Sequence, residues 1–319
     1  MKILVTGGLG FIGFNLCNRL TEESHDVCII DSKDSRSGFN KLHSEILKEK
    51  GAVIIEDTIS NTGLHAGKLK DIDIVFNLAS LIGHMDSMKR PVEDLKENTA
   101  EHVAFLQFMR TIRPRKIIYT STRQIYGNQE KMPVDENTCP KPVDVNGINK
   151  YTTELYHRVY GDVYDFELTV MRLTNIYGPG MHIRDNRLSF LGWFINRGLT
   201  GNDIEIFGSG RNSRDMLYID DLIETIIRSM DSDFSGIVNI GGPEESTIIE
   251  SAEIIEELCT ECSIVFREFP QERKKIDIGN FITDNTRARD NLGHNPKTGL
   301  KDGLKRTLEY FRQYREYYI

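Results

Sequence analysis

A glycine-rich segment near the amino terminus constrains the fold more than any other part of the chain. Residues 6–13 read Thr-Gly-Gly-Leu-Gly-Phe-Ile-Gly, directly after the apolar run Lys2–Thr6 and directly before an amphipathic helical pattern. Gly7, Gly10 and Gly13 allow a tight turn and a close approach of the backbone to a ligand, while the following helix offers its free N–H groups. A strand, this loop and a helix, in that order, predict a dinucleotide-binding site.

Short apolar runs alternate with amphipathic stretches over the first 175 residues. The runs are almost continuously apolar, which is typical of strands covered on both faces. Two longer stretches, Val92–Arg110 and Asn149–Tyr164, have helical periodicity. The alternation predicts an α/β fold with a doubly wound, parallel Rossmann sheet. The predicted strands are Lys2–Thr6, Asp26–Asp31, Ala52–Glu56, Ile72–Leu78, Lys116–Thr120 and Leu168–Leu173.

The pattern changes after residue 175, where Tyr-Gly-Pro-Gly at 177–180 interrupts it. We therefore expect a first domain over 1–175 and a smaller, mixed α/β cap over 176–319 that covers the carboxyl end of the sheet. Residues 215–241 are candidates to return to the first domain. The tyrosine-rich segment after Arg306 predicts a terminal helix with a frayed end.

Composition narrows the class of protein. The chain has 319 residues and a net charge of −8, which disfavours non-specific binding to nucleic acid. We find no signal peptide and no apolar run long enough to cross a membrane, so we expect a cytoplasmic protein. Five cysteines do not suggest a disulfide framework. Cys259 and Cys262 form a lone CxxC pair, and with no second pair we expect no metal site.

Acidic residues at strand ends bear on the choice of cofactor. Asp31 ends the second predicted strand, 18 residues after Gly13. A carboxylate there hydrogen-bonds the adenosine ribose and repels a 2′-phosphate, which favours NAD over NADP. Lys33 and Arg36 are near enough in the sequence to offset part of that repulsion. Asp57 is a candidate acceptor for the adenine amino group, or alternatively a turn residue at the end of the third strand.

Four further segments carry a family resemblance. They are Asn77–Ser80 (NLAS), Tyr119–Gly127 (YTSTRQIYG), Arg172–Pro179 (RLTNIYGP) and Gly208–Asp221 (GSGRNSRDMLYIDD). With the GxxGxxG spacing of the first loop, they resemble the extended short-chain dehydrogenase/reductase family, and within it the NAD-dependent nucleotide-sugar epimerases and dehydratases. The resemblance covers nearly the whole chain, in order.

The resemblance implies a function for individual residues. Thr122 takes the catalytic Ser/Thr position, and Lys150 takes the position of the lysine that holds the nicotinamide ribose. The partner implied is a nucleotide-diphosphate sugar, and a homodimer formed through the two long helices is typical of the family. The residues implied at the substrate are Thr122, Arg123, Asn175, Arg214 and Arg273. Those implied at the cofactor are Gly7, Gly10, Phe11, Ile12, Gly13, Asp31, Asp57, Thr58, Leu78, Ala79, Ser80, Asn98, Thr120 and Lys150.

One position departs from the family pattern. The family lysine belongs to a YxxxK motif, but residues 146–150 here read Asn-Gly-Ile-Asn-Lys, so Asn146 stands in place of the tyrosine. That tyrosine acts as a phenolate and removes a proton from the sugar hydroxyl. An asparagine amide cannot accept this proton.

Several explanations stay open. His84, in the loop after the fourth strand, is the best titratable candidate for the base. Tyr126 or Tyr177 is another, and Thr122 relaying the proton to water is a third. Alternatively, the protein binds cofactor and sugar without chemistry, as a sensor.

A second departure bears on the reaction. The 4,6-dehydratases of this family carry an Asp-Glu pair directly after the catalytic threonine, and the decarboxylases usually carry a glutamate there. This chain has Arg123 and Gln124. Because elimination of water needs a positioned acid, we expect a 4-epimerase or a 4-dehydrogenase, with a 4,6-dehydratase as the alternative.

Overall fold

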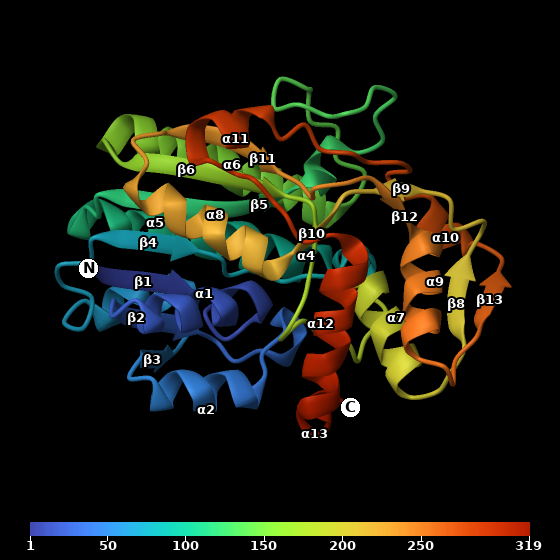
Figure 1. Cartoon of the computed structure of the whole chain (residues 1–319). Coiled ribbons are helices and arrows are strands. Elements are labelled where there is room, and N and C mark those ends of the chain that lie inside the picture. Colours follow the sequence, from blue (N-terminus) through green and yellow to red (C-terminus); the bar gives the residue numbers. More distant parts are fainter.

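The structure, a computed structural model, describes residues 1–319 and is built around one seven-stranded parallel sheet (Figure 1). The order of the strands is β11-β6-β5-β4-β1-β2-β3, and every neighbouring pair is parallel. This arrangement confirms the predicted doubly wound sheet. The strands are β1 (Lys2–Thr6), β2 (Asp26–Asp31), β3 (Val53–Glu56), β4 (Ile74–Asn77), β5 (Lys116–Thr122), β6 (Glu167–Leu173) and β11 (Gly236–Ile240).

Helices cover both faces of the sheet. One face packs against α1 (Phe11–Glu22), α2 (Lys41–Glu49) and α8 (Ile219–Asp231), and the other against α5 (Glu101–Ile112) and α6 (Val145–Tyr164). Successive residues of β1 enter opposite cores, as the two-residue repeat of a strand requires. The core on the α1 face continues without a break into the C-terminal part of the chain. The two parts of the molecule are therefore packed together rather than joined by a linker.

The sheet reverses its winding between β1 and β4. From β1 the chain proceeds to β2 and β3 on one side, and then returns to place β4, β5 and β6 on the other side. Open α/β sheets bind ligands outside the carboxyl ends of the strands at such a point.

Much of the C-terminal part of the chain lies beyond the tips of the strand arrows (Figure 1). Three small sheets form there: β7 (Asn175–Tyr177) with β10 (Met216–Tyr218), β8 (Ile204–Phe207) with β13 (Ile264–Arg267), and β9 (Ser213–Arg214) with β12 (Ser246–Thr247). The helices of this part are α7 (Phe190–Leu199), α9 (Ile248–Leu258), α10 (Gln271–Lys274), α12 (Leu300–Gln313) and α13 (Arg315–Tyr318). By contrast, α11 (Thr286–Leu292) returns to the main sheet and packs against β11 and α8 (Figure 1).

Two segments differ from the prediction. The stretch expected as one helix is divided into α4 (Pro91–Leu95), a π-helical turn (Lys96–Ala100) and α5. The C-terminal end is anchored rather than frayed. Tyr318 is buried, and its hydroxyl lies 2.7 Å from Nε2 of His43. The other ring nitrogen of His43, Nδ1, lies 2.9 Å from the carbonyl oxygen of Leu9 in the glycine loop. Burial of the tyrosine ring explains why this end is ordered.

The remaining short elements lie in connections: α3 (His84–Lys89) and the 3₁₀ turns Ser35–Ser37, Ile59–His65 and Arg123–Tyr126. None of the helices is both long enough and apolar enough to cross a membrane. Cys259 and Cys262 are free and buried near the end of α9.

Candidate active site

A cavity of about 770 Å³ lies along the carboxyl edge of the sheet. Its walls come from the loops after β1, β2, β4 and β5, the start of α6, and the C-terminal part of the chain. The site residues expected from the sequence line it, except Asn98 and the two tyrosines considered as alternative bases, Tyr126 and Tyr177. They are Gly7, Gly10, Phe11, Ile12, Gly13, Asp31, Asp57, Thr58, Leu78, Ala79, Ser80, His84, Thr120, Thr122, Arg123, Asn146, Lys150, Asn175, Arg214 and Arg273.

The glycine loop forms a close-fitting cradle. Gly7 has a φ of +67°, and a Cβ there would lie 2.9 Å from the Cα of Ala79. A Cβ on Gly13 would lie 2.2 Å from the carbonyl oxygen of Gly7. Gly10 begins α1 without a side-chain cap, so the N–H groups of the first turn have no side-chain acceptor. The loop therefore fits a pyrophosphate, which binds through such N–H groups.

Asp31 is fixed by the same loop. Its two oxygens accept hydrogen bonds from the backbone N–H groups of Leu9, at 2.9 Å, and Lys33, at 2.8 Å. Burial raises the pKa of Asp31, and these backbone donors oppose the effect. The two nearby cations are already paired, Lys33 with Glu56 and Arg36 with a set of carboxylates (Asp34, Glu93 and Glu97). Neither cation is free to offset the repulsion of a 2′-phosphate.

Two other residues expected at the cofactor have partners within the protein. Asp57 accepts hydrogen bonds from its neighbours, and the bond from His65 is the main cause that lowers its pKa. Asn98 does not line the cavity because it is fully buried on the π-helical turn. Its amide bonds Ser80 and Leu81, at 2.9 to 3.1 Å, and so supports the loop after β4.

Thr122 and Lys150 both line the cavity. Thr122 ends β5, and its hydroxyl accepts a hydrogen bond from the backbone N–H of Gln124 at 3.2 Å. Lys150 projects from α6, and its Nζ donates to the carbonyl of Thr120 at 2.9 Å. Burial lowers the pKa of Lys150 to about 8. Keeping the Lys150 ammonium group charged at this buried position therefore lowers the stability of the folded protein.

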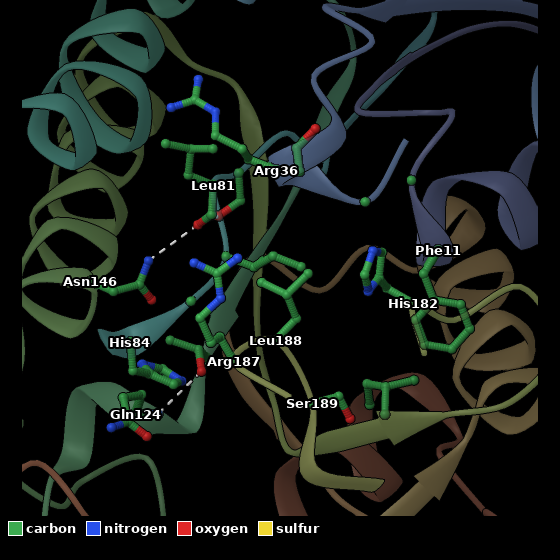
Figure 2. A pocket seen from close by; sticks show the side chains of 18 of the residues that line it. Phe11, Arg36, Leu81, His84, Gln124, Asn146, His182, Arg187, Leu188 and Ser189 are labelled. Atoms are coloured by element: carbon green, nitrogen blue, oxygen red, sulfur yellow. Dashed lines mark hydrogen bonds between the residues drawn. The ribbon is translucent and has the colours of Figure 1, made fainter. Parts of the chain in front are cut away.

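Asn146 does not present a proton acceptor like a phenolate. It lies in the first turn of α6, four residues before Lys150, and its Nδ2 donates to the carbonyl of Leu81 at 3.2 Å (Figure 2). Its backbone N–H donates to the hydroxyl of Ser87 at 3.1 Å. The side chain therefore ties the helix to the loop after β4.

The two tyrosines considered as replacements are wrong candidates. Tyr126 is fully buried, and its hydroxyl donates to Asn239 at 2.7 Å and accepts from Arg172. Tyr177 is also fully buried, and its hydroxyl faces the carbonyl of Leu300 at 3.4 Å. Neither ring lines the cavity, and burial raises the pKa of both phenols. Packing on all sides prevents either from reaching a ligand.

His84, by contrast, is partly exposed within the cavity. It is the first residue of α3, and 44% of its side chain is accessible. Its Nδ1 lies 2.9 Å from Oδ2 of Asp144, a carboxylate with no exposed surface. Sequence reasoning missed Asp144, although an aspartate just before a helical pattern is a typical cap signal.

Arginines gather at the end of the cavity formed by the C-terminal part. Nη1 of Arg123 is buried without a hydrogen-bond partner, and burial, with a smaller effect of Arg214, lowers its pKa to about 9. Arg214 donates to the carbonyl of Ser213 at 2.8 Å, but its buried Nε has no partner. Arg273 stacks over Phe207 at 5.3 Å. Such unpaired donors fit an anionic ligand.

The loop between β7 and α7 also contributes residues that the sequence did not indicate. His182, Arg187, Leu188 and Ser189 project toward the cavity from this segment (Figure 2). Arg187 pairs with Asp86 of α3 at 3.1 Å. The motif Arg172–Pro179 ends before these four residues, so only the three-dimensional fold reveals their position.

Comparisons with known proteins identify the family to which the chain is similar. The sequence profile of the NAD dependent epimerase/dehydratase family matches residues 3–241. A UDP-glucose 4-epimerase of Mycolicibacterium smegmatis is 30% identical over 322 residues, which cover 98% of this chain and 99% of the relative.

Solved structures are similar over the whole chain. The UDP-glucose 4-epimerase of Thermotoga maritima with UDP-glucose has a TM-score of 0.90 and 29% identity, covering 99% of this chain and 100% of that one. The UDP-glucuronic acid 4-epimerase of Bacillus cereus, in complex with UDP-glucuronic acid and NAD, has a TM-score of 0.88 and 26% identity, covering 98% and 100%.

Proposed function

The chain belongs to the NAD-dependent epimerase/dehydratase family, and we propose that it is a 4-epimerase of a nucleotide-diphosphate sugar. The observation that carries the proposal is the composition of one cavity. The glycine loop, Thr122, Lys150 and the arginines come from distant parts of the chain and line the same space. A 4-dehydrogenase uses the same first half-reaction and is the nearest alternative.

The residues of the glycine loop fit NAD. The cradle at Gly7 and Gly13 would be filled by any Cβ, the start of α1 has free N–H groups, and Asp31 lies beside the loop. When bound, NAD supplies a hydride acceptor and donor. Lys150 would hold the nicotinamide ribose, and its charge favours the negative charge that develops on the sugar oxygen.

Thr122 and the arginines would orient the sugar nucleotide. The Thr122 hydroxyl is a donor that can hydrogen-bond the sugar oxygen whose proton is lost and regained. Arg123, Arg214 and Arg273 would bind the diphosphate, with Asn175 beside them, since its buried Oδ1 has no partner. In this proposal residues 1–175 and 215–241 carry the cofactor, and the rest of 176–319 carries the nucleotide sugar.

We also propose a homodimer. Exposed apolar side chains follow one stripe of α6, with 50% exposure at Ile148, 57% at Val159 and 61% at Val163. The four-residue spacing places Val159 and Val163 on one side of the helix. Val92 and Leu95 of α4 are exposed as well, at 78% and 48%. A second copy of α6 would cover this stripe in a four-helix bundle.

Two measurements test the proposal. Mass spectrometry of the denatured protein identifies what it releases, and we expect NAD or NADH. The protein is then incubated with NAD and either UDP-glucose or UDP-glucuronic acid, and the C4 epimer is followed by NMR. Appearance of the epimer supports a 4-epimerase, whereas a stable keto-sugar with stoichiometric NADH supports the dehydrogenase. Binding of both ligands without any reduced cofactor would indicate a sensor.

A further inference from the structure

We infer that His84, oriented by Asp144, is the group that takes the proton from the sugar hydroxyl and returns it. The inference rests on the proposed function, because it names the base of that reaction. The dyad replaces the phenolate that Asn146 cannot provide.

Contact geometry links the two side chains. His84 Nδ1 lies 2.9 Å from Asp144 Oδ2, but the angle between them is not that of a hydrogen bond, and the nitrogen has no hydrogen-bond partner. The distance is that of a hydrogen bond, and catalytic hydrogen bonds that are poorly aligned in a ligand-free enzyme tighten when the substrate binds. The opposite edge of the imidazole carries Nε2, and the side chain is 44% exposed on the cavity wall that Asn146 and Gln124 also form (Figure 2).

Asp144 is held in place from three directions. As the N-cap of α6 it accepts the backbone N–H of Gly147 through Oδ1 at 2.6 Å. Gln124 donates to Oδ2 at 2.8 Å, beside His84. Burial raises the pKa of Asp144, but the interaction with His84, followed by the hydrogen bonds from Gly147 and Gln124, outweighs burial and lowers the pKa below its usual range. The carboxylate is therefore ionised.

The ionised carboxylate favours one tautomer of His84. A carboxylate without a proton only accepts hydrogen bonds and repels the lone pair of a nitrogen 2.9 Å away, so we expect Nδ1 to carry the hydrogen. In a neutral imidazole the other nitrogen, Nε2, then holds a lone pair and can accept a proton. Asp144 also stabilises the imidazolium that forms, as the carboxylate does in a Ser-His-Asp triad.

Asn146 has a definite position in this arrangement. Its backbone N–H donates to Ser87 Oγ, which in turn donates to the carbonyl of His84 at 2.8 Å. Its side-chain amide holds the carbonyl of Leu81, three residues before His84. Asn146 thus positions the segment that carries the base, from the same helix turn that supplies Asp144.

The proton and electrons balance in this scheme. The O–H bond of the sugar hydroxyl breaks and its proton goes to His84 Nε2. The C–H electron pair of the same carbon leaves as hydride to the oxidised cofactor, and a carbon–oxygen double bond forms. The reverse step returns both, and His84 gives its proton back to the oxygen.

The first test reads the tautomer and needs no activity. Protein labelled with ¹⁵N-histidine and loaded with NAD is measured by NMR, and the His84 signals are assigned by their absence in His84→Asn. We expect the Nδ1–H tautomer in the wild-type protein. An Nε2–H tautomer would overturn the inference, because Nε2 would then have no lone pair for the proton.

The second test is the rate of a single turnover. Reduction of bound NAD by UDP-glucose and by UDP-glucuronic acid is followed at 340 nm. General-base catalysis contributes roughly 10²- to 10⁴-fold, so His84→Asn should be at least about 100-fold slower with unchanged affinity for NAD and UDP. Asp144→Asn keeps a competent helix cap and should also be slowed. The matched control His25→Asn, at the amino end of the sheet, should react like the wild type.

The outcomes separate the two proposals. An active wild-type protein and an equally fast His84→Asn overturn the base assignment and leave the epimerase intact. A wild-type protein that reduces NAD with neither sugar overturns the proposed function, and the tautomer then decides the dyad by itself.

Discussion

Replacing Lys150 by methionine should stabilise the cofactor-free protein. Burial lowers the pKa of Lys150 from 10.5 to about 8. At about 1.4 kcal/mol for each pH unit, this difference corresponds to roughly 3 kcal/mol of lost stability while the lysine is charged in both states. The variant also loses the hydrogen bond to Thr120 and the contact over the Tyr119 ring, worth about 1 kcal/mol each. We expect Lys150→Met to raise the free energy of unfolding by roughly 1–2 kcal/mol at pH 7.

The pH dependence of this stability difference distinguishes removal of the buried charge from improved packing of the methionine side chain. The unfolded chain keeps the lysine proton up to pH 10.5, whereas the folded protein loses it near pH 8. Wild-type stability therefore gains from this group as the pH rises between those values, and the advantage of Lys150→Met should fade. Urea unfolding of both proteins at pH 7 and pH 10 measures the two differences. A less stable variant at pH 7, or an advantage independent of pH, would refute the reasoning. Added NAD should stabilise the wild type far more than the variant.

Three further substitutions test other parts of the site. Gly13→Ala brings a Cβ within 2.2 Å of the Gly7 carbonyl, so it should abolish NAD binding by calorimetry and cost about 1–3 kcal/mol of stability; unchanged binding contradicts the cradle. Arg123→Met removes a partly buried cation whose Nη1 has no hydrogen-bond partner, so UDP-sugar affinity should fall about tenfold or more while NAD affinity holds; an equal loss of both would count against its assignment to the substrate. Val159→Glu places a charge in the exposed stripe of α6, and light scattering should then show a monomer; a variant with the wild-type mass argues against this interface.

Local sequence signals predicted most of the fold. The bounds of β1 and β2 match the predicted apolar runs, because strands buried on both faces consist almost entirely of apolar residues. The π-helical turn at Lys96–Ala100 could not be predicted, since its residues continue the helical periodicity of their neighbours. The turn is supported by tertiary contacts of Asn98, which no local pattern indicates. The anchored C-terminal end depends in the same way on a distant partner, His43.

The site shows the same division between local and long-range information. The glycine loop, Thr122 and Lys150 belong to contiguous motifs and were visible in the sequence. The partner of His84 was not, because Asp144 follows it by 60 residues and only the packing of α3 on α6 brings them together. Likewise, the exclusion of Tyr126 and Tyr177 depends on burial, which no motif reports.

The orientation of Asp144 favours an enzyme over a sensor. A protein that only binds NAD and a nucleotide sugar needs the glycine loop and the arginines, whose unpaired donors are satisfied by the ligands. It does not need a buried carboxylate beside a cavity histidine. Capping of α6 uses only Oδ1 of Asp144, whereas Oδ2 is held toward His84 by Gln124. A buried carboxylate is costly unless both of its oxygens have partners. Neither helix capping nor ligand binding requires Oδ2 to lie beside His84, whereas proton transfer by His84 does.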